Sequence, residues 1–297
     1  MTHDTKPLIR AFFDEATFTA SYLVIDPATR EAAIIDSVLD YDPRSGKVST
    51  TNADKLLAAV VKENATVRWI LETHAHADHL TAAQYLKTKT AAKLGIGARI
   101  TDVQTIFEPI FDLDTAAKKG SEFDHWFADG EKFKIGNLTV EVMATPGHTP
   151  ACVSYKIGDA VFVGDTLFMP DYGTARADFP GGDAHMLYRS IQRLLTLPDE
   201  TRLFLCHDYK APGRNEFVWE TNVGDERQHN VHIRQGVTET EFVTMRQARD
   251  ATLAAPVLLL PSIQVNIHAG HLPKASENGQ RYLKIPLTLD KQIGAAL

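Results

Sequence analysis

Cysteine is scarce in this chain, and long apolar runs are missing. Cys152 and Cys206 are the only cysteines in 297 residues, too few for the disulfide framework of a small secreted domain. No apolar run approaches the roughly 20 residues that a membrane-spanning helix needs, and Met1 does not begin a basic and then apolar leader. We therefore expect a cytoplasmic protein that does not enter a membrane, with both cysteines as small buried residues. For Cys206, which adjoins His207, a place in the lining of a pocket is the alternative.

An excess of positive charge is also missing. The chain has 31 Lys and Arg against 38 Asp and Glu, a net charge of -7, which argues against nucleic acid or an acidic membrane surface as a general partner. With 44% hydrophobic and 23% charged residues, the composition is that of an ordinary globular protein. The length favours one large domain, which we place at residues 1–255, with residues 256–297 as a C-terminal extension packed on the same domain.

Apolar periodicity and turn residues predict two blocks of strands, each followed by helices. Strands are expected at residues 8–13, 18–25, 31–36, 67–71, 93–97, 131–135, 138–144, 152–157, 160–163 and 202–206. Helices are expected after an Asn52 cap, from His79, and at residues 99–111 (ended by Pro109), 183–197, 224–233 and 240–253. Residues 41–51 are polar and are predicted to form a loop. This order favours an α+β fold in which two mixed sheets pack between outer helices, an αββα sandwich.

Metal-binding side chains are concentrated at residues 73–79, directly after the strand predicted at residues 67–71. The stretch reads Thr-His-Ala-His-Ala-Asp-His. If the strand continues, His74 and His76 point to the same side, because side chains alternate along a strand. Asp78 would lie near the start of the following helix, where partial positive charge favours a carboxylate. The pattern predicts a site for one or two metal ions.

The same order of strand and then metal-type residue occurs at three further places. His148, Asp165 and His207 follow the strands that end near residues 144, 163 and 206. Ligands in sheet proteins collect beyond the ends of strands. We therefore expect all four places to converge on one metal centre.

Four motifs together resemble the metallo-β-lactamase superfamily: residues 73–79, Pro146-Gly147-His148-Thr149, Gly164-Asp165-Thr166 and Cys206-His207-Asp208-Tyr209. The segment 173–179, the run from His207 to Tyr209 and Glu226-Arg227 further resemble the glyoxalase II-like branch that includes the persulfide dioxygenases. The resemblance implies an enzyme with one Fe(II) per chain that oxidises glutathione persulfide, or another low-molecular-weight persulfide, with O2 and water to sulfite and glutathione. It also implies a homodimer.

Carried over to this chain, the resemblance implies His74, His148 and Asp165 as the iron ligands, the facial set of non-haem Fe(II) oxygenases. The positions that would complete a dinuclear site in glyoxalase II are expected here to orient ligands and water: His76, Asp78, His79 and His207. Zinc, or a dinuclear site, remains an alternative because imidazole and carboxylate accept both metals.

Substrate contacts are expected from residues close to these motifs. Arg176 is predicted to clamp an anionic group, and Asp178 to fix either Arg176 or a ligand histidine. A purely structural salt bridge between Arg176 and Asp178 is the competing interpretation. Tyr209 is predicted to hydrogen-bond substrate. Lys210 and Arg214 are predicted to attract the carboxylates of glutathione.

The main alternative function is hydrolysis of a thioester by two metals and a bridging hydroxide, as in glyoxalase II. A lactonase is a weaker alternative, and a protein that only stores metal or binds a partner is the weakest. The longer segment at residues 168–175 leaves open which thiol carries the persulfide. For His268 and His271 we favour a structural or pocket-lining role over metal binding, and for the histidines at 125, 185, 229 and 232 a surface or helix-face position.

Overall fold

The computed structural model describes residues 6–113 and 121–289, and two sheets form its centre. The first has six strands in the order β1-β2-β3-β6-β8-β9. Its strands are β1 (Leu8–Asp14), β2 (Thr19–Ile25), β3 (Glu31–Ile35), β6 (Thr66–Leu71), β8 (Lys93–Gly97) and β9 (His125–Phe127). Strands β3, β6, β8 and β9 run parallel, whereas β1 and β2 are antiparallel to their neighbours.

The second sheet also has six strands, in the order β10-β11-β12-β13-β14-β15. They are β10 (Lys132–Ile135), β11 (Leu138–Ala144), β12 (Val153–Ile157), β13 (Ala160–Phe162), β14 (Arg202–Phe204) and β15 (Glu220–Asn222). Because β12 is antiparallel to both β11 and β13, and β13 is parallel to β14, strands β11, β13 and β14 run in one direction. The C-terminal ends of these three strands therefore lie on the same side of the sheet.

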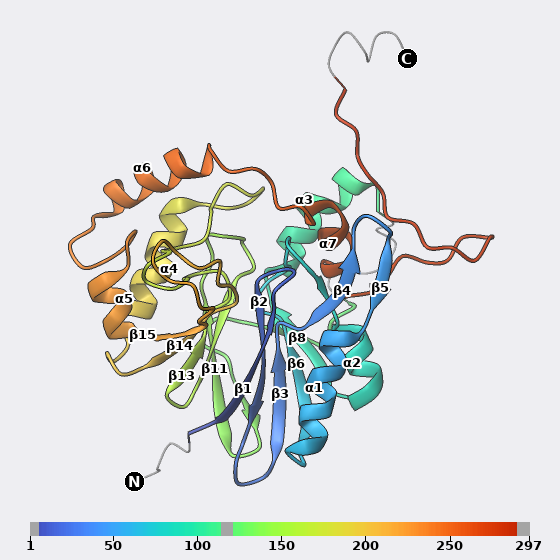
Figure 1. Cartoon of the computed structure of the whole chain (residues 1–297), viewed down its shortest axis with the longest axis horizontal. Coiled ribbons are helices and arrows are strands. Elements are labelled where there is room, and N and C mark those ends of the chain that lie inside the picture. Colours follow the sequence, from blue (N-terminus) through green and yellow to red (C-terminus); the bar gives the residue numbers. More distant parts are fainter. Residues whose placement is uncertain (1–5, 114–120, 290–297) are drawn as a thin grey trace.

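Helices cover the outer face of each sheet (Figure 1). On the first sheet lie α1 (Thr51–Lys62), α2 (Ala83–Thr90), α3 (Ile100–Phe111) and α7 (Leu259–Asn266), and on the second lie α4 (Ala184–Leu195), α5 (Val223–His229) and α6 (Glu239–Asp250). This is the predicted αββα sandwich, and the prediction of the fold is confirmed. No helix in the described ranges is both long and apolar enough to cross a membrane.

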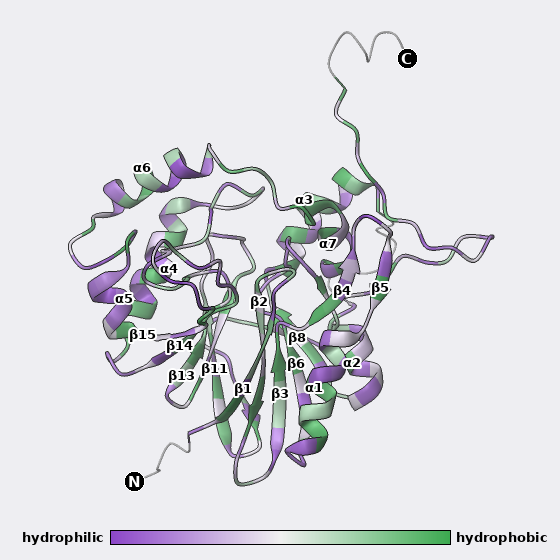
Figure 2. Cartoon of the chain, viewed as in Figure 1, coloured by the Kyte–Doolittle hydropathy of each residue, from purple (hydrophilic) through white to green (hydrophobic). Residues whose placement is uncertain are grey.

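The side chains of one strand contribute to two hydrophobic cores, one between the sheets and one beneath the helices, because they alternate between its two faces. In β2, Tyr22 and Val24 face the core between the sheets, while Leu23 and Ile25 face the helices. Successive side chains of a strand point to opposite faces, so a strand buried on both sides has an unbroken apolar run. Figure 2 shows this pattern as strands that are mainly hydrophobic and helices whose exposed turns are hydrophilic.

The helix caps agree with the predicted boundaries in two cases. The Asp183 side chain accepts hydrogen bonds from the backbone of His185 and Met186 at the start of α4. Thr238 and Glu241 form a reciprocal capping box at the start of α6, an arrangement that satisfies two otherwise free backbone groups. The predicted Asn52 cap is wrong: α1 begins at Thr51, and the Asn52 side chain instead bonds the Asp40 carboxylate at 2.8 Å.

Three further predictions of local structure are wrong. The loop predicted at residues 41–51 contains a hairpin of β4 (Val38–Asp42) and β5 (Lys47–Ser49), in which Tyr41 pairs with Val48. The helix predicted from His79 begins only at Ala83, because residues 80–81 form β7 (Leu80–Thr81), which pairs with β4. Pro109 does not end α3, which continues to Phe111.

Candidate metal centre

Three of the predicted ligands meet beyond the ends of their strands. His74 follows β6, His148 follows β11 and Asp165 follows β13. Nε2 of His74 lies 3.7 Å and Nε2 of His148 lies 3.5 Å from the same Asp165 oxygen, Oδ2. One ligand atom from each of the three residues lies within 4.8 Å of the others, and all three side chains are buried. This group has the two imidazoles and one carboxylate that the sequence predicts.

Hydrogen bonds turn the correct nitrogen of each ligand histidine toward the centre. Nδ1 of His148 donates to the carbonyl of Arg176 at 2.8 Å, since a carbonyl can only accept. Nδ1 of His74 lies 3.0 Å from the Thr73 hydroxyl, which gives its single proton to Asp36. His74 must therefore donate from Nδ1 as well. Both Nε2 atoms are left as lone-pair donors, the state that a metal requires.

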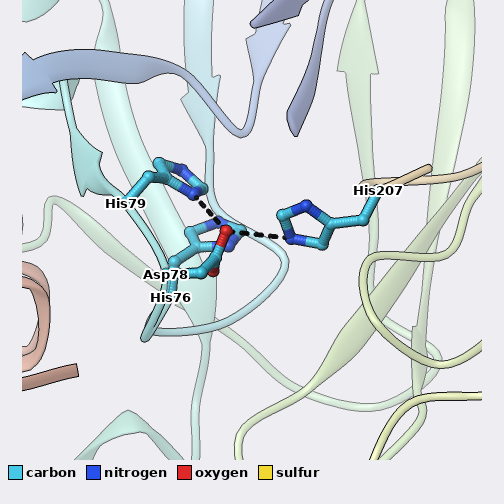
Figure 3. A group of neighbouring side chains, drawn as sticks. All are labelled: His76, Asp78, His79 and His207. Carbon is cyan, nitrogen blue, oxygen red and sulfur yellow. Dashed lines mark hydrogen bonds and ion pairs between the residues drawn. The ribbon is translucent and has the colours of Figure 1, made fainter. Parts of the chain in front are cut away.

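A second group of donors adjoins the first and consists of His76, Asp78, His79 and His207 (Figure 3). Oδ2 of Asp78 lies 3.2 Å from Nδ1 of His79 and 3.3 Å from Nε2 of His207. His207 also donates from Nδ1 to the Phe18 carbonyl at 3.1 Å. The predicted outer positions are therefore gathered in space, close enough to act on the ligands or to hold a further ion.

The expectation that His74 and His76 project from a continuing strand is wrong, although their rings do lie side by side, with centroids 4.1 Å apart. β6 ends at Leu71, and the two imidazoles belong to different groups. Nε2 of His76 lies 3.1 Å from Asp36 and 3.3 Å from Glu72. Burial opposes a charge on His76, but the Asp36 and Glu72 carboxylates outweigh it and raise the pKa of His76 well above its usual value. The predicted position of Asp78 at a helix start is also wrong, because α2 begins at Ala83.

Unpaired buried atoms test whether these residues suit a metal. Nε2 of His74, His79 and His207 and Oδ1 of Asp165 are buried and make no hydrogen bond. Leaving a buried polar atom without a partner costs roughly 1–3 kcal/mol, and four such atoms are clustered here. A cation at the first group would satisfy Nε2 of His74, and a cation at the second group would satisfy Nε2 of His79 and His207. Imidazole and carboxylate suit iron or zinc. The donor set therefore fits a metal.

Gly147 allows the chain to pass close to α4 just before His148. Its φ is +141°, and a Cβ atom at this position would lie 2.3 Å from the backbone of Leu187. The Gly147 carbonyl also accepts from the backbone of Asp183, the cap of α4, at 2.8 Å. The close packing of this loop on α4 therefore fixes where His148 enters the site.

A cavity of about 670 Å³ opens onto the metal centre. Asp78, His148 and Asp165 are among its lining residues, and so is a group of neighbouring aromatic rings, Phe18, Phe168, Tyr172 and Tyr209. The ring centroid of Tyr209 lies 5.3 Å from that of Tyr172 and 5.9 Å from that of Phe168. A larger surface depression of about 830 Å³ beside α5 contains none of the predicted site residues, so the smaller cavity is the candidate substrate pocket.

Three arginines line the same cavity: Arg176, Arg246 and Arg249. Arg176 donates to Asp178 at 2.6 and 2.8 Å and to the Ala254 carbonyl at 2.7 Å. Arg246 is paired in the same way with Asp250 at 2.7 Å. The exposed Arg249 makes no side-chain hydrogen bond or ion pair with any residue that the structure describes. It is therefore the cationic group of the cavity that is free to meet an anion.

The other two predicted substrate residues lie outside the lining of this cavity. Nζ of Lys210 lies 4.1 Å from the centre of the Phe217 ring. Arg214 pairs with both Asp171 and Asp208. Tyr209, in contrast, lines the cavity as expected. A substrate role for Lys210 or Arg214 stays a prediction.

Cys206 belongs to two groups of possible metal ligands, with Asp36 and His76 and with Asp165 and His207, whereas Cys152, His232 and His268 are held in structural contacts. Both cysteines are buried, and burial raises the pKa of the Cys152 thiol to about 12. Nδ1 of His268 pairs with Glu122 at 3.0 Å, and Nδ1 of His232 accepts from the backbone of Thr174 at 3.0 Å. Neither histidine belongs to the groups of possible metal ligands found in the described ranges.

Sequence reasoning missed three polar residues of the centre: Asp36, Glu72 and Asn266. Asp36 and Glu72 each follow directly on a strand, β3 and β6, so the rule that found His148 and Asp165 would have found them too. Asn266 lies in α7, far along the chain, and its amide bonds the backbone of the His-rich stretch. No local pattern marks that contact.

The comparisons with known proteins agree with this geometry. A sequence profile described as the metallo-beta-lactamase superfamily matches residues 15–207. The chain belongs to this superfamily of metal-dependent hydrolase-like enzymes, and its His and Asp side chains form the metal-binding site.

Individual relatives have names that point to different activities. The chain is 55% identical to a probable metallo-hydrolase of Burkholderia pseudomallei, over 94% of this chain and 98% of that protein. It is 50% identical to glyoxylase B2 of Dictyostelium discoideum, over 97% and 99%. It is 31% identical to the human mitochondrial persulfide dioxygenase ETHE1, over 68% of each chain. Among solved structures, ETHE1 from Myxococcus xanthus has a TM-score of 0.71 and 32% identity, over 89% of this chain and all of that one.

Proposed function

We propose that this protein is a persulfide dioxygenase that acts on glutathione persulfide. In the overall reaction the persulfide, O2 and one water give sulfite and glutathione. The outer sulfur loses four electrons, which O2 accepts; the S–S bond breaks, and a proton from water or the persulfide goes to the released thiolate. The likeness to persulfide dioxygenases in sequence and in fold supports this assignment.

The single observation that carries the proposal is the group of His74, His148 and Asp165, whose ligand atoms lie within 4.8 Å of one another. Its atoms converge on one point, while His76 is directed toward Asp36 and Glu72. Two imidazoles and one carboxylate leave open positions on an Fe(II) ion, which supplies the redox chemistry between O2 and the persulfide sulfur when it is bound.

The protein's own residues position the substrate and keep bulk water away. The aromatic group of the cavity, with Phe168, Tyr172 and Tyr209, gives an apolar surface beside the metal ligands. Such a surface limits access of water to a reactive sulfur. His148 is held by the Arg176 carbonyl, so the backbone of the arginine segment orients a ligand while its side chain forms part of the cavity wall.

The free guanidinium of Arg249 is assigned to a carboxylate of the glutathione moiety. Arg176 and Arg246 already share their charge with Asp178 and Asp250, whereas Arg249 does not. Guanidinium pairs with carboxylate through two parallel hydrogen bonds. A cavity lined by both arginines and aromatic rings suits a substrate that has both an anionic peptide part and a sulfur end.

The second group of donors favours one rival function. His76, Asp78, His79 and His207 lie within 4.8 Å of one another, and with Asp165 they offer a second metal position. A dinuclear enzyme would hydrolyse a glutathione thioester, and the 50% identity to glyoxylase B2 is in line with that reading.

One preparation can decide between these functions. Protein purified without oxygen is given glutathione persulfide in an oxygen electrode and, separately, a glutathione thioester. We expect O2 uptake with sulfite formed in equal amount, and no thioester cleavage above background. His148→Ala should abolish O2 uptake, whereas His185→Ala on the surface of α4 should not. Thioester cleavage without O2 uptake would reject the proposal.

A further inference from the structure

The ligand-bearing stretch at residues 72–79 has no regular secondary structure. Its backbone N–H and C=O groups therefore lack the partners that a helix or sheet ladder provides. Buried backbone groups almost always find a partner elsewhere, because an unpaired one costs about as much as a lost hydrogen bond. His74, His76 and His79 are all buried, so something outside the stretch must hold their backbone.

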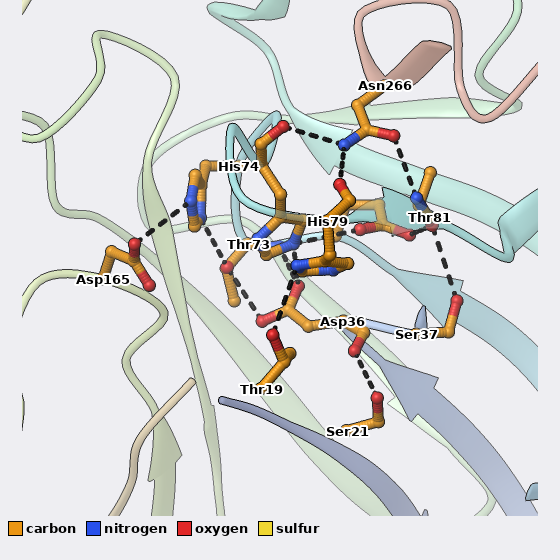
Figure 4. Close-up of polar contacts among 12 residues, drawn as sticks. Thr19, Ser21, Asp36, Ser37, Thr73, His74, His79, Thr81, Asp165 and Asn266 are labelled. Atoms are coloured by element: carbon orange, nitrogen blue, oxygen red, sulfur yellow. Dashed lines mark hydrogen bonds and ion pairs between the residues drawn. The ribbon is translucent and has the colours of Figure 1, made fainter. Parts of the chain in front are cut away.

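Asn266 supplies two of these bonds and a third to the start of the chain that follows, at Thr81 in β7 (Figure 4). Its Nδ2 donates to the carbonyl of His76 at 2.8 Å and to the carbonyl of His79 at 2.7 Å. Its Oδ1 accepts from the backbone N–H of Thr81 at 2.9 Å. Both amide protons and the amide oxygen are thus used on one short stretch of chain, and the side chain is only 3% exposed.

The contact extends beyond the backbone to a histidine side chain. The Thr81 hydroxyl donates to Glu72 at 2.6 Å, and the other Glu72 oxygen lies 3.3 Å from Nε2 of His76. A shift of Thr81 would therefore move the carboxylate that faces His76. Asn266 controls both the path of the chain through the metal centre and one of the groups that orient its imidazoles.

Helix α7 is itself held firmly at this place. The Gln104 side chain donates to the carbonyl of Ile267 at 2.7 Å, and Gln84 donates to the carbonyl of Ala269 at 3.0 Å. Ile263, Val265 and Ile267 are buried in the core beneath the first sheet. An anchor of this kind can hold a loop in one conformation, because it moves only if the core moves.

We propose that Asn266 is a positioning residue that sets the geometry of the metal centre from the C-terminal segment. It lies outside residues 15–207, which match the superfamily profile. The segment after α6 therefore completes the site rather than only covering it. The inference rests on the metal centre and not on the choice between persulfide and thioester, so failure of the proposed reaction would leave it standing.

The test compares two buried amides of the same helix. Gln264 is 4% exposed and also makes three hydrogen bonds, to Leu260 and Lys284, but none to the metal-binding stretch. Asn266→Ala and Gln264→Ala are each freed of metal, checked for folding by circular dichroism, and titrated with Co²⁺ and Zn²⁺. Hydrogen exchange of the backbone at residues 72–81 is measured on the metal-free proteins.

We expect the two variants to lose similar thermal stability but to differ in metal binding. Asn266→Ala should bind metal about 10–100-fold more weakly, the usual cost of losing a group that orients ligands, and should change the visible spectrum of bound Co²⁺. Its residues 72–81 should also exchange faster. Gln264→Ala should keep the affinity and spectrum of the parent protein.

Equal metal affinity and equal exchange in the two variants would overturn the inference. If Asn266→Ala does not fold, Asn266→Ser takes its place, because a hydroxyl retains one donor and disturbs packing less. A serine variant with the affinity, spectrum and exchange of Gln264→Ala would then overturn the inference in the same way.

Discussion

Asp165 turns one carboxylate oxygen to the first group of donors and the other to His207. Its Oδ2 faces the ligand histidines, and its Oδ1 lies 3.3 Å from Nε2 of His207. The number of metals in the centre therefore depends on whether His207 binds an ion or only orients Asp165. In the proposed dioxygenase His207 only orients Asp165, whereas in a dinuclear hydrolase it would bind the second metal.

Substitution of His207 separates the two readings. With one iron held by His74, His148 and Asp165, His207→Ala should keep about one metal per chain and lose activity about 10–100-fold, because Asp165 loses an orienting partner. His148→Ala should lose the metal itself. Metal analysis of both variants after anaerobic purification provides the check. A fall from two metals to one in His207→Ala would favour the hydrolase.

Arg249→Ala should raise the KM for glutathione persulfide about tenfold and leave kcat and metal content nearly unchanged. The reason is that a hydrogen bond to a charged group contributes roughly 1.5 kcal/mol and the guanidinium touches no metal ligand. Arg234→Ala, an exposed arginine that does not line the cavity, is the control. Steady-state O2 uptake at varied substrate gives both constants. Equal KM values in the two variants would remove Arg249 from the substrate site.

Arg176→Ala tests the predicted clamp. The variant should bind metal normally, because the group that holds His148 is the backbone carbonyl of residue 176 and not its side chain. We expect the KM for glutathione persulfide to rise, because the clamp predicts that the guanidinium also meets substrate. If it serves only Asp178, thermal stability falls and KM does not change. A double-mutant cycle with Asp178→Ala measures the coupling between the two side chains. An unchanged KM in Arg176→Ala would reject the clamp.

Stability at alkaline pH should depend on Glu226. Burial raises the pKa of this carboxyl to about 8, and its Oε1 has no hydrogen-bond partner. Between the unfolded pKa, about 4.3, and the folded one, the native state binds the extra proton, so the free energy of unfolding falls as pH rises through this window. Glu226→Gln should therefore be more stable than the parent at pH 9, by roughly 3–5 kcal/mol, and similar to it at pH 4.

Urea unfolding at both pH values measures this difference. Glu15→Gln, a change at an exposed glutamate, should show no such dependence on pH. A constant difference between Glu226→Gln and the parent across the range would contradict the assignment of the buried carboxyl.

Many of the strands can be predicted from the sequence because burial leaves a pattern in it. A strand covered on both faces has a continuous apolar run. The run from Tyr22 to Ile25 in β2 is apolar throughout since both of its faces are covered, Tyr22 by the second sheet and Leu23 by the helices. The sites that follow β11, β13 and β14 are predictable for a related reason. All three strands end on the same side of the sheet, and the polar residues that follow them can gather there.

What could not be predicted depends on contacts between distant segments. The helix expected from His79 fails because β7 pairs with β4 and Thr81 bonds Asn266. The hairpin of β4 and β5 was missed because its residues are largely polar and read as a loop. The division of His74 and His76 between two groups depends on the contact of His76 with Asp36, and no local pattern in the sequence indicates that pairing.

The most direct test of the account is the metal content of protein purified without oxygen, measured together with O2 uptake on the same sample. We expect one iron per chain and O2 consumption that begins when glutathione persulfide is added and stops when the iron is removed. Two zinc ions per chain, in a protein that cleaves a glutathione thioester and consumes no O2, would contradict it.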